Sequence, residues 1–96
     1  MYHKLATVRR IAKELDINGT LEVSNKKNKR FQITLSNGTN IHFGQFPFNG
    51  RGAFIDHHDN KIKSAWQKRH SKILIDGEPA FLNIYSPEYY SWHLLW

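Results

Sequence analysis

The chain has 96 residues, 40% of them hydrophobic and 14% aromatic, with a formal net charge of +6 at neutral pH and no cysteine. This length predicts a small single domain with one modest core. The lack of cysteine excludes disulfides and thiolate zinc sites, and the positive charge favours anionic partners such as nucleic acid or acidic protein surfaces.

No stretch of the sequence approaches the roughly 18 consecutive apolar residues that a membrane span requires. The N-terminus also lacks the apolar core of a secretory signal peptide. We therefore expect a soluble intracellular protein that has no export signal and no membrane partner.

The first segment of the chain has the periodicity of a helix. Apolar residues recur at helical spacing between His3 and Leu15, with basic residues mostly opposite them. Asn18-Gly19 supplies a stop signal. We predict an amphipathic helix within residues 1–17, whose basic face is either a solvated surface or a contact for nucleic acid.

Alternating apolar and polar residues predict a three-strand antiparallel meander over residues 20–44. The length of its second turn can be inferred from the pairing of apolar residues on the two strands that the turn connects. A two-residue loop at Asn37-Gly38 would mix apolar and polar side chains on both faces, whereas a three-residue loop pairs Ile33 with Ile41. We predict the three-residue loop, with its glycine in the left-handed region. This register leaves His42 on the face away from the main core.

A loop and a second helix follow the meander. The loop, residues 44–52, contains Phe46-Pro47-Phe48, whose aromatic rings either plug the edge of the core or stack on bases. Asp59 or Asn60 is suited to cap a helix over residues 61–71. The inner stripe of this helix comprises Ile62, Ala65, Trp66 and either Arg69 or His70.

The last part of the chain reads as a hairpin or an extended arm over residues 73–85, and then a helix over residues 86–96. Ser86 suits the cap of that helix and Pro87 suits its first position. From Tyr89 onward the helix has almost no polar face, so the rest of the domain or a partner must cover it. The predicted fold is therefore α+β, an antiparallel sheet of three or more strands packed with two or three helices.

Some residues are expected to support this fold rather than to bind a ligand. They combine large aromatic rings with side chains that can hydrogen-bond to the terminal helix. The set is Arg69, His70, Trp66, Trp92 and Trp96.

Clustered cations give a candidate nucleic-acid surface, because phosphate binding requires little more than gathered positive charge. One group lies in the first loop of the meander and the other along the second helix. The set is Lys26, Lys27, Lys29, Arg30, Lys61, Lys63, Lys68 and Lys72. No known sequence-reading motif accompanies them, so we expect any binding to be weakly sequence-specific.

Six histidines raise the alternative of a metal site, with Asp56, His57 and His70 as its centre. An Asp-His pair before a helix that ends in His is similar to the metal site of the ββα-metal (HNH) nucleases. The spacing departs from that motif, because Asn60 follows His57 by only three residues, where the motif has an intervening strand and loop. The structural alternative is that His57 and neighbouring His58 are loop residues and that His70 is a hydrogen-bonded core histidine.

Several short motifs together resemble a group of small uncharacterised proteins of tailed phages and large DNA viruses. The motifs are His42-Phe43-Gly44, the Asp/His loop around His58, Arg69-His70, Asp76-Gly77, Ser86-Pro87, Tyr90-Ser91 and Leu95-Trp96. The resemblance covers residues 30–96. It implies a viral origin and no particular activity.

The sequence therefore favours a non-catalytic viral protein, a virion component or assembly factor that acts through protein surfaces. Its partners would be other viral proteins or further copies of itself, in the virion or the host cytoplasm. The alternative is a weakly sequence-specific nucleic-acid-binding protein, and the third hypothesis is a metal-dependent nuclease. We expect no cofactor.

Overall fold

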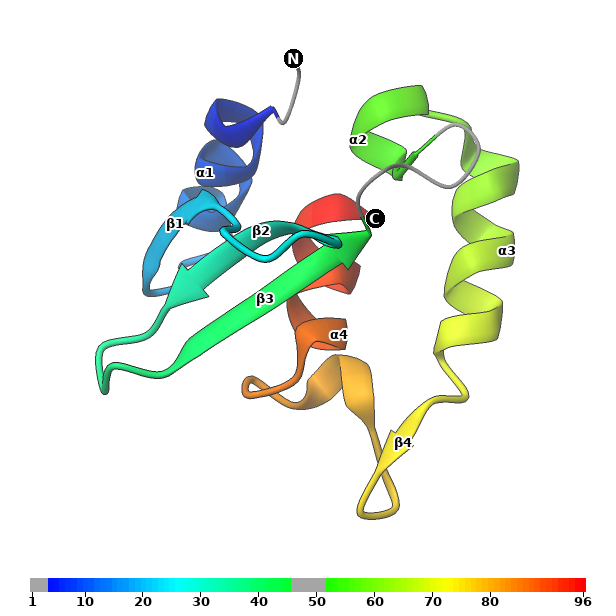
Figure 1. Ribbon diagram of the computed structural model, residues 1–96. Helices are drawn as coiled ribbons and strands as arrows, with labels where there is room; N and C mark the ends of the chain where they lie inside the picture. Colours follow the sequence, from blue (N-terminus) through cyan, green and yellow to red (C-terminus); the bar gives the residue numbers. More distant parts are fainter. Residues whose placement is uncertain (1–3, 46–51) are drawn as a thin grey trace. The chain divides into compact units, whose positions relative to one another are not determined.

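The computed structural model describes residues 4–45 and 52–96, and it confirms the α+β fold class (Figure 1). The chain divides into two compact units, residues 1–47 and 48–96. We call them the N-terminal unit and the C-terminal unit and describe each by itself. The expectations for residues 1–3 and for Phe46-Pro47-Phe48 lie outside the described residues.

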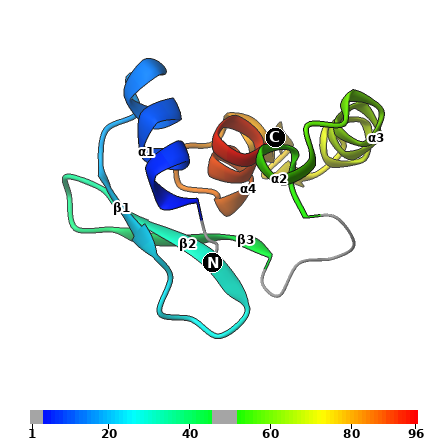
Figure 2. The ribbon, with the colours of Figure 1, turned by 90° about the horizontal axis from the view of Figure 1, so that it is seen from above.

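The N-terminal unit is a helix followed by a three-stranded antiparallel sheet. Its elements are α1 (Leu5–Glu14), β1 (Thr20–Val23), β2 (Lys29–Thr34) and β3 (Asn40–Gln45). The strand order is β1-β2-β3, so the predicted meander is confirmed. Figures 1 and 2 show α1 on one side of the sheet, beside β1.

Helix α1 ends earlier than the Asn18-Gly19 signal predicted. Asp16 takes a left-handed conformation, with φ of 57°. Its N–H bonds to the Lys13 carbonyl at 3.2 Å, and the N–H of Ile17 bonds to the Ala12 carbonyl at 2.9 Å. This pair of bonds is a Schellman motif, which satisfies the last carbonyls of the helix. Because aspartate tolerates the left-handed region, no glycine was needed to stop the helix.

The second turn of the meander has the predicted three-residue form. Gly38 has φ of 87°, its N–H bonds to the Leu35 carbonyl at 2.9 Å, and the N–H of Leu35 bonds to the Thr39 carbonyl at 2.9 Å. Ile33 consequently pairs with Ile41. One face of the sheet is therefore apolar, and its buried side chains are Leu21, Phe31, Ile33, Ile41 and Phe43.

The C-terminal unit is built from short elements. They are α2 (Phe54–His57), α3 (Asn60–His70), β4 (Leu74–Ile75), β5 (Glu78–Pro79), the 3-10 helix η1 (Ala80–Leu82), α4 (Pro87–Tyr90) and the π-helix η2 (Ser91–Leu95). Helix α3 begins as predicted, because the Asp59 carboxylate accepts the N–H groups of Lys61 at 2.9 Å and Ile62 at 3.3 Å. The four-residue helix α2 was not predicted. No helix within the described residues is long and apolar enough to span a membrane.

The inner stripe of α3 differs from the predicted one. Ala65 and Arg69 are exposed, whereas Ile62, Trp66 and His70 are half-buried. Arg69 therefore cannot act as the internal support that its pairing with His70 suggested. The structure leaves that role to Trp66 and His70.

The terminal segment is a turn of α-helix that widens into a π-helix. Ser86 caps it as predicted, accepting the N–H of Glu88 at 3.1 Å. The N–H of Trp96 bonds five residues back to the Ser91 carbonyl at 3.1 Å, which defines the wider turn. The helix predicted over residues 86–96 is therefore present from Pro87 to Leu95, but its second half has π geometry and not α geometry. Tyr90, Leu94 and Leu95 are buried.

Candidate interaction surfaces

The predicted lysine loop of the N-terminal unit is exposed, but its last cation is not. Lys26 and Lys27 are exposed and Lys29 is half-buried. Arg30 is only 1% exposed, which corrects its place among the surface cations. Its carbonyl accepts the N–H of Ser24 at 3.1 Å, so the residue belongs to the pairing of β1 with β2.

The face of the sheet opposite the apolar side chains carries a network of polar groups. Ser24 Oγ lies 2.7 Å from His42 Nδ1, and it accepts the N–H of Lys26 at 3.0 Å. Gln32 Oε1 accepts the N–H of Asn25 at 3.2 Å. The predicted position of His42 away from the apolar face is confirmed by its pairing with Gln32.

Burial, followed by the charges of Lys26 and Lys29, lowers the pKa of His42 below its ordinary value of 6.5. The Nδ1 atom of a neutral imidazole can accept a hydrogen bond from the Ser24 hydroxyl. Sequence reasoning missed Ser24. The alternation of β1, continued one residue past its end, would have placed this serine on the same face as His42.

Most of the excess positive charge belongs to the N-terminal unit. Residues 1–47 contain eight Lys and Arg residues against three Asp and Glu, whereas residues 48–96 contain six against five. A charge difference between two halves of a chain is typical of proteins that bind polyanions with one half.

The lysines of α3 belong to the C-terminal unit and differ in their surroundings. Lys61 and Lys68 are exposed on α3, and Lys72 is exposed just after it. Lys63 is half-buried, and its Nζ lies 4.5 Å from the centre of the Phe54 ring in a cation–π contact. Lys63 therefore contributes to packing within its unit.

An aromatic cluster joins α3 to the terminal segment. Trp66 stacks on Trp96 with ring centres 4.7 Å apart, and it stacks on His70 at 3.9 Å. The ring of Trp92 lies 5.7 Å from Trp66 and stacks on Phe81 at 4.1 Å. These ring contacts connect α3 and η1 with the terminal segment within the C-terminal unit.

The candidate metal ligands Asp56, His57 and His70 each have a separate partner. The Asp56 carboxylate accepts the N–H of Ala53 at 2.8 Å. His57 Nδ1 accepts the N–H of Asp59 at 2.9 Å, and His70 Nδ1 lies 2.7 Å from Glu88 Oε2. Within residues 4–45 and 52–96, no group of three or more His, Cys, Asp or Glu residues is arranged to hold a metal ion.

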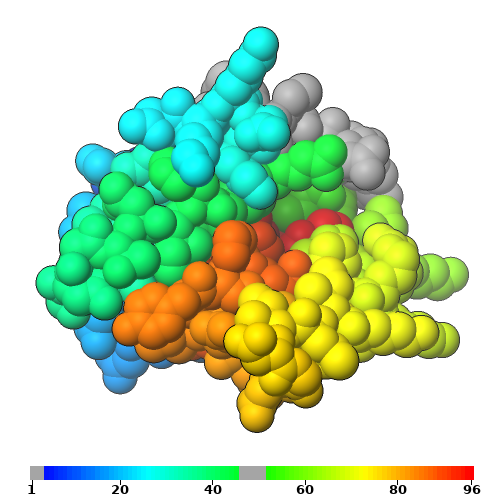
Figure 3. Space-filling model, turned by 60° about the horizontal axis from the view of Figure 1, so that its bottom comes forward, coloured from blue at the N-terminus to red at the C-terminus, as the bar shows by residue number. Residues whose placement is uncertain are grey.

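The C-terminal unit also exposes large apolar side chains that sequence reasoning did not single out. They lie on the β4–β5 hairpin and the segment after it, coloured yellow to orange in Figure 3. We call this set the apolar patch, and it comprises Ile73, Leu74, Ile75, Leu82, Ile84 and Tyr85, with exposed fractions between 37% and 58%.

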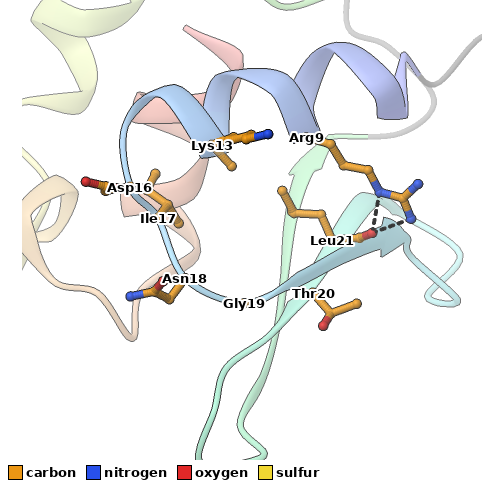
Figure 4. A pocket seen from close by; sticks show the side chains of 9 residues that line it. Arg9, Lys13, Asp16, Ile17, Asn18, Gly19, Thr20 and Leu21 are labelled. Atoms are coloured by element: carbon orange, nitrogen blue, oxygen red, sulfur yellow. Dashed lines mark hydrogen bonds between the residues drawn. The ribbon is translucent and has the colours of Figure 1, made fainter.

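A shallow hollow lies between the end of α1 and the start of β1 (Figure 4). Arg9 lies at one end of it, and its Nε and Nη2 donate to the Leu21 carbonyl at 3.1 and 2.9 Å. This contact covers the outer edge of β1, which is an edge strand of the sheet. Arg9, which lines the hollow, is therefore held by a contact that joins α1 to β1.

A family model described as a family of unknown function, DUF5754, matches residues 19–70. The matched segment contains the three-stranded sheet, the lysine loop, His42, α2 and α3. No curated protein and no solved structure matches the chain. Because the match covers more than half of the sequence, the chain belongs to the DUF5754 family of unknown function.

Proposed function

We propose that the chain is a non-catalytic protein that acts through its surfaces. It would be a virion component or an assembly factor of a tailed phage or large DNA virus, the viruses whose small proteins its sequence resembles. The apolar patch carries this proposal. Large apolar side chains gathered on one segment are typical of a protein-binding site, because burial against a partner gains about 25 cal/mol for each Å² removed from water.

The surroundings of the other candidate residues also support a non-catalytic role. Asp56 and Asp59 accept backbone N–H groups at the starts of α2 and α3, and His70 is stacked on Trp66. These are contacts that hold the fold together.

The test is whether the protein enters virus particles through the apolar patch. Mass spectrometry of particles purified from the source virus should detect the protein. Leu82→Gln, at a position 58% exposed within the patch, should reduce its abundance in particles. Leu15→Gln is the matched control, because Leu15 is 51% exposed but lies in the N-terminal unit. Absence from particles, or equal incorporation of both variants, would contradict the proposal.

A second candidate function is weakly sequence-specific nucleic-acid binding by the N-terminal unit. The concentration of charge in residues 1–47 favours it, together with the exposed Lys26 and Lys27 beside the polar face of the sheet. Lysines that contact phosphates release counterions, so binding weakens steeply with salt.

This candidate is tested by titrating duplex and single-stranded DNA at two salt concentrations. Replacing Lys26, Lys27 and Lys29 by Gln should lower the salt slope by about 1 for each lysine that binds a phosphate. The same change at Lys61, Lys68 and Lys72 removes equal charge from the other unit and should leave the slope close to that of the parent. Absence of binding at low salt would end the candidate.

A further inference from the structure

Strand β4 has an open edge in the C-terminal unit. In an antiparallel pair, alternate residues direct their N–H and C=O groups toward the partner strand and away from it. The Ile73 carbonyl accepts the N–H of Ala80 at 2.8 Å, so Ile73 is directed toward β5. Leu74 pairs with Pro79, which has no N–H to donate. The backbone N–H and C=O of Leu74 therefore point away from β5, at a residue whose side chain is 58% exposed.

The sequence around this edge is complementary to itself. Residues 72–76 read Lys-Ile-Leu-Ile-Asp. If a second copy of this segment runs antiparallel with Leu74 opposite Leu74, each Lys72 lies near the Asp76 of the other copy, because these two exposed residues stand in the turns on either side of β4. Ile73 likewise lies opposite Ile75. Apolar side chains then meet apolar ones and cations meet anions on both sides of the two-fold axis.

We propose that two copies of this chain associate through β4, with the two-fold axis at Leu74. This inference rests on the proposed function, in that it names the partner of part of the apolar patch. At the axis the N–H and C=O groups of the two Leu74 residues form a closely spaced pair of hydrogen bonds, which is the arrangement that an outward-facing residue provides.

Charge selects a second copy over an unrelated apolar strand. Lys72 and Asp76 flank the apolar residues on either side, and both are exposed. Natural edge strands often carry charges that prevent pairing, because like charges would meet. Here the order of the two signs makes the antiparallel self-pairing attractive. Because only three residues of each copy meet in the ladder, the dimer is of the weak, transient class.

Sedimentation velocity over a concentration series tests the inference on the purified full chain. The parent should shift from monomer to dimer as its concentration rises. Lys72→Asp places two carboxylates near each other at both ends of the pairing and should abolish the shift. Asp76→Lys places two ammonium groups near each other and should do the same. An equimolar mixture of these two variants restores opposite charges at both ends and should associate again.

Lys68→Asp is the matched control, because it makes the same charge change at an exposed lysine of α3 outside the pairing. It should dimerise like the parent, and circular dichroism should show all variants folded. A parent that stays monomeric, a control that behaves like Lys72→Asp, or a mixture that fails to associate would overturn the inference. A monomeric parent that still enters virus particles would overturn the dimer alone and leave the proposed function standing.

Discussion

The imidazole of His70 and the carboxylate of Glu88 meet at 2.7 Å, between Nδ1 and Oε2, and join the last residue of α3 to the first turn of α4. Their side chains are 28% and 14% exposed. The same imidazole stacks on Trp66. The contact therefore fixes the terminal segment against α3 at a point where the aromatic cluster meets solvent.

A double-mutant cycle should detect coupling between these two residues. We expect His70→Ala and Glu88→Ala each to lower the free energy of unfolding by about 1–2 kcal/mol, because each leaves a partly buried partner without its hydrogen bond. The double variant should lose less than the sum of the two, with a coupling of about 1 kcal/mol in urea unfolding. Strict additivity would show that the contact contributes nothing to stability.

Arg9 should contribute to stability in a way that its neighbour Arg10 does not. Both are exposed residues of α1, but Arg9 donates two hydrogen bonds to the Leu21 carbonyl. Lysine keeps the charge and the helix propensity but cannot donate from two fixed nitrogens. Arg9→Lys should therefore cost about 1 kcal/mol in thermal unfolding, and Arg10→Lys less than about 0.5 kcal/mol. Equal effects would contradict the structural role of this contact.

Local signals in the sequence predicted the elements that depend on local chemistry. The register of β2 and β3 followed from matching apolar residues across a turn, so Ile33 was correctly paired with Ile41. Ser86 and Asp59 were correctly identified as caps, because a side-chain oxygen before a helix satisfies N–H groups that have no other partner.

The features that sequence reasoning missed depend on tertiary contacts or on segments too short for periodicity. Helix α2 spans only four residues, less than the length over which a hydrophobic period can be recognised. The alternation of β2 places Arg30 on the polar face, but no local pattern shows that it is covered there. The π-helical turn before Trp96 could not be predicted from the sequence. The number of residues per turn is recognised from the spacing between apolar and polar faces, and this segment has almost no polar face.

His42 should make the protein less stable at acidic pH. Its pKa in the folded state is lowered from 6.5, so the unfolded chain binds the proton more readily. Neutral His42 thus makes its full contribution to the free energy of unfolding above pH 6.5, and this contribution declines as the pH falls through the lower pKa of the folded state. We expect the free energy of unfolding of the parent to fall more steeply below pH 6.5 than that of His42→Asn. Parallel pH profiles of the two proteins, measured by urea unfolding, would contradict this assignment.

Gly52 and Gly38 should respond differently to the same substitution. Both have positive φ, 86° and 87°. A Cβ at Gly38 would meet no atom within 4 Å, whereas one at Gly52 would lie 2.6 Å from Asp56 Oδ2. Gly38→Ala should cost about 1–2 kcal/mol from the left-handed backbone alone.

Gly52→Ala should cost about 1 kcal/mol more than Gly38→Ala, because the Asp56 carboxylate must move and weaken its bond to the Ala53 N–H. Adding Asp56→Ala to Gly52→Ala should then cost less than Asp56→Ala costs in the parent, since the clash has been removed. Urea unfolding of the four proteins measures this difference. Equal costs at the two glycines would show that the close approach to Asp56 is relaxed without penalty.

The buried end of the chain should be necessary for the stability of the C-terminal unit. Leu94 is 1% exposed and Leu82 is 58% exposed, so the same truncation to alanine tests burial directly. Leu94→Ala should cost about 2–5 kcal/mol, because it removes apolar contacts and leaves a cavity. Leu82→Ala should change the free energy of unfolding by less than about 0.5 kcal/mol.

Deleting residues 94–96 extends this test. The deletion removes Leu94, Leu95 and the Trp96 ring that stacks on Trp66, and its cost approaches the total stability of a small domain. We expect the C-terminal unit to lose its cooperative transition, read from the fluorescence of Trp66 and Trp92. A truncated chain that melts at the temperature of the parent would show that the terminal segment does not form part of the core.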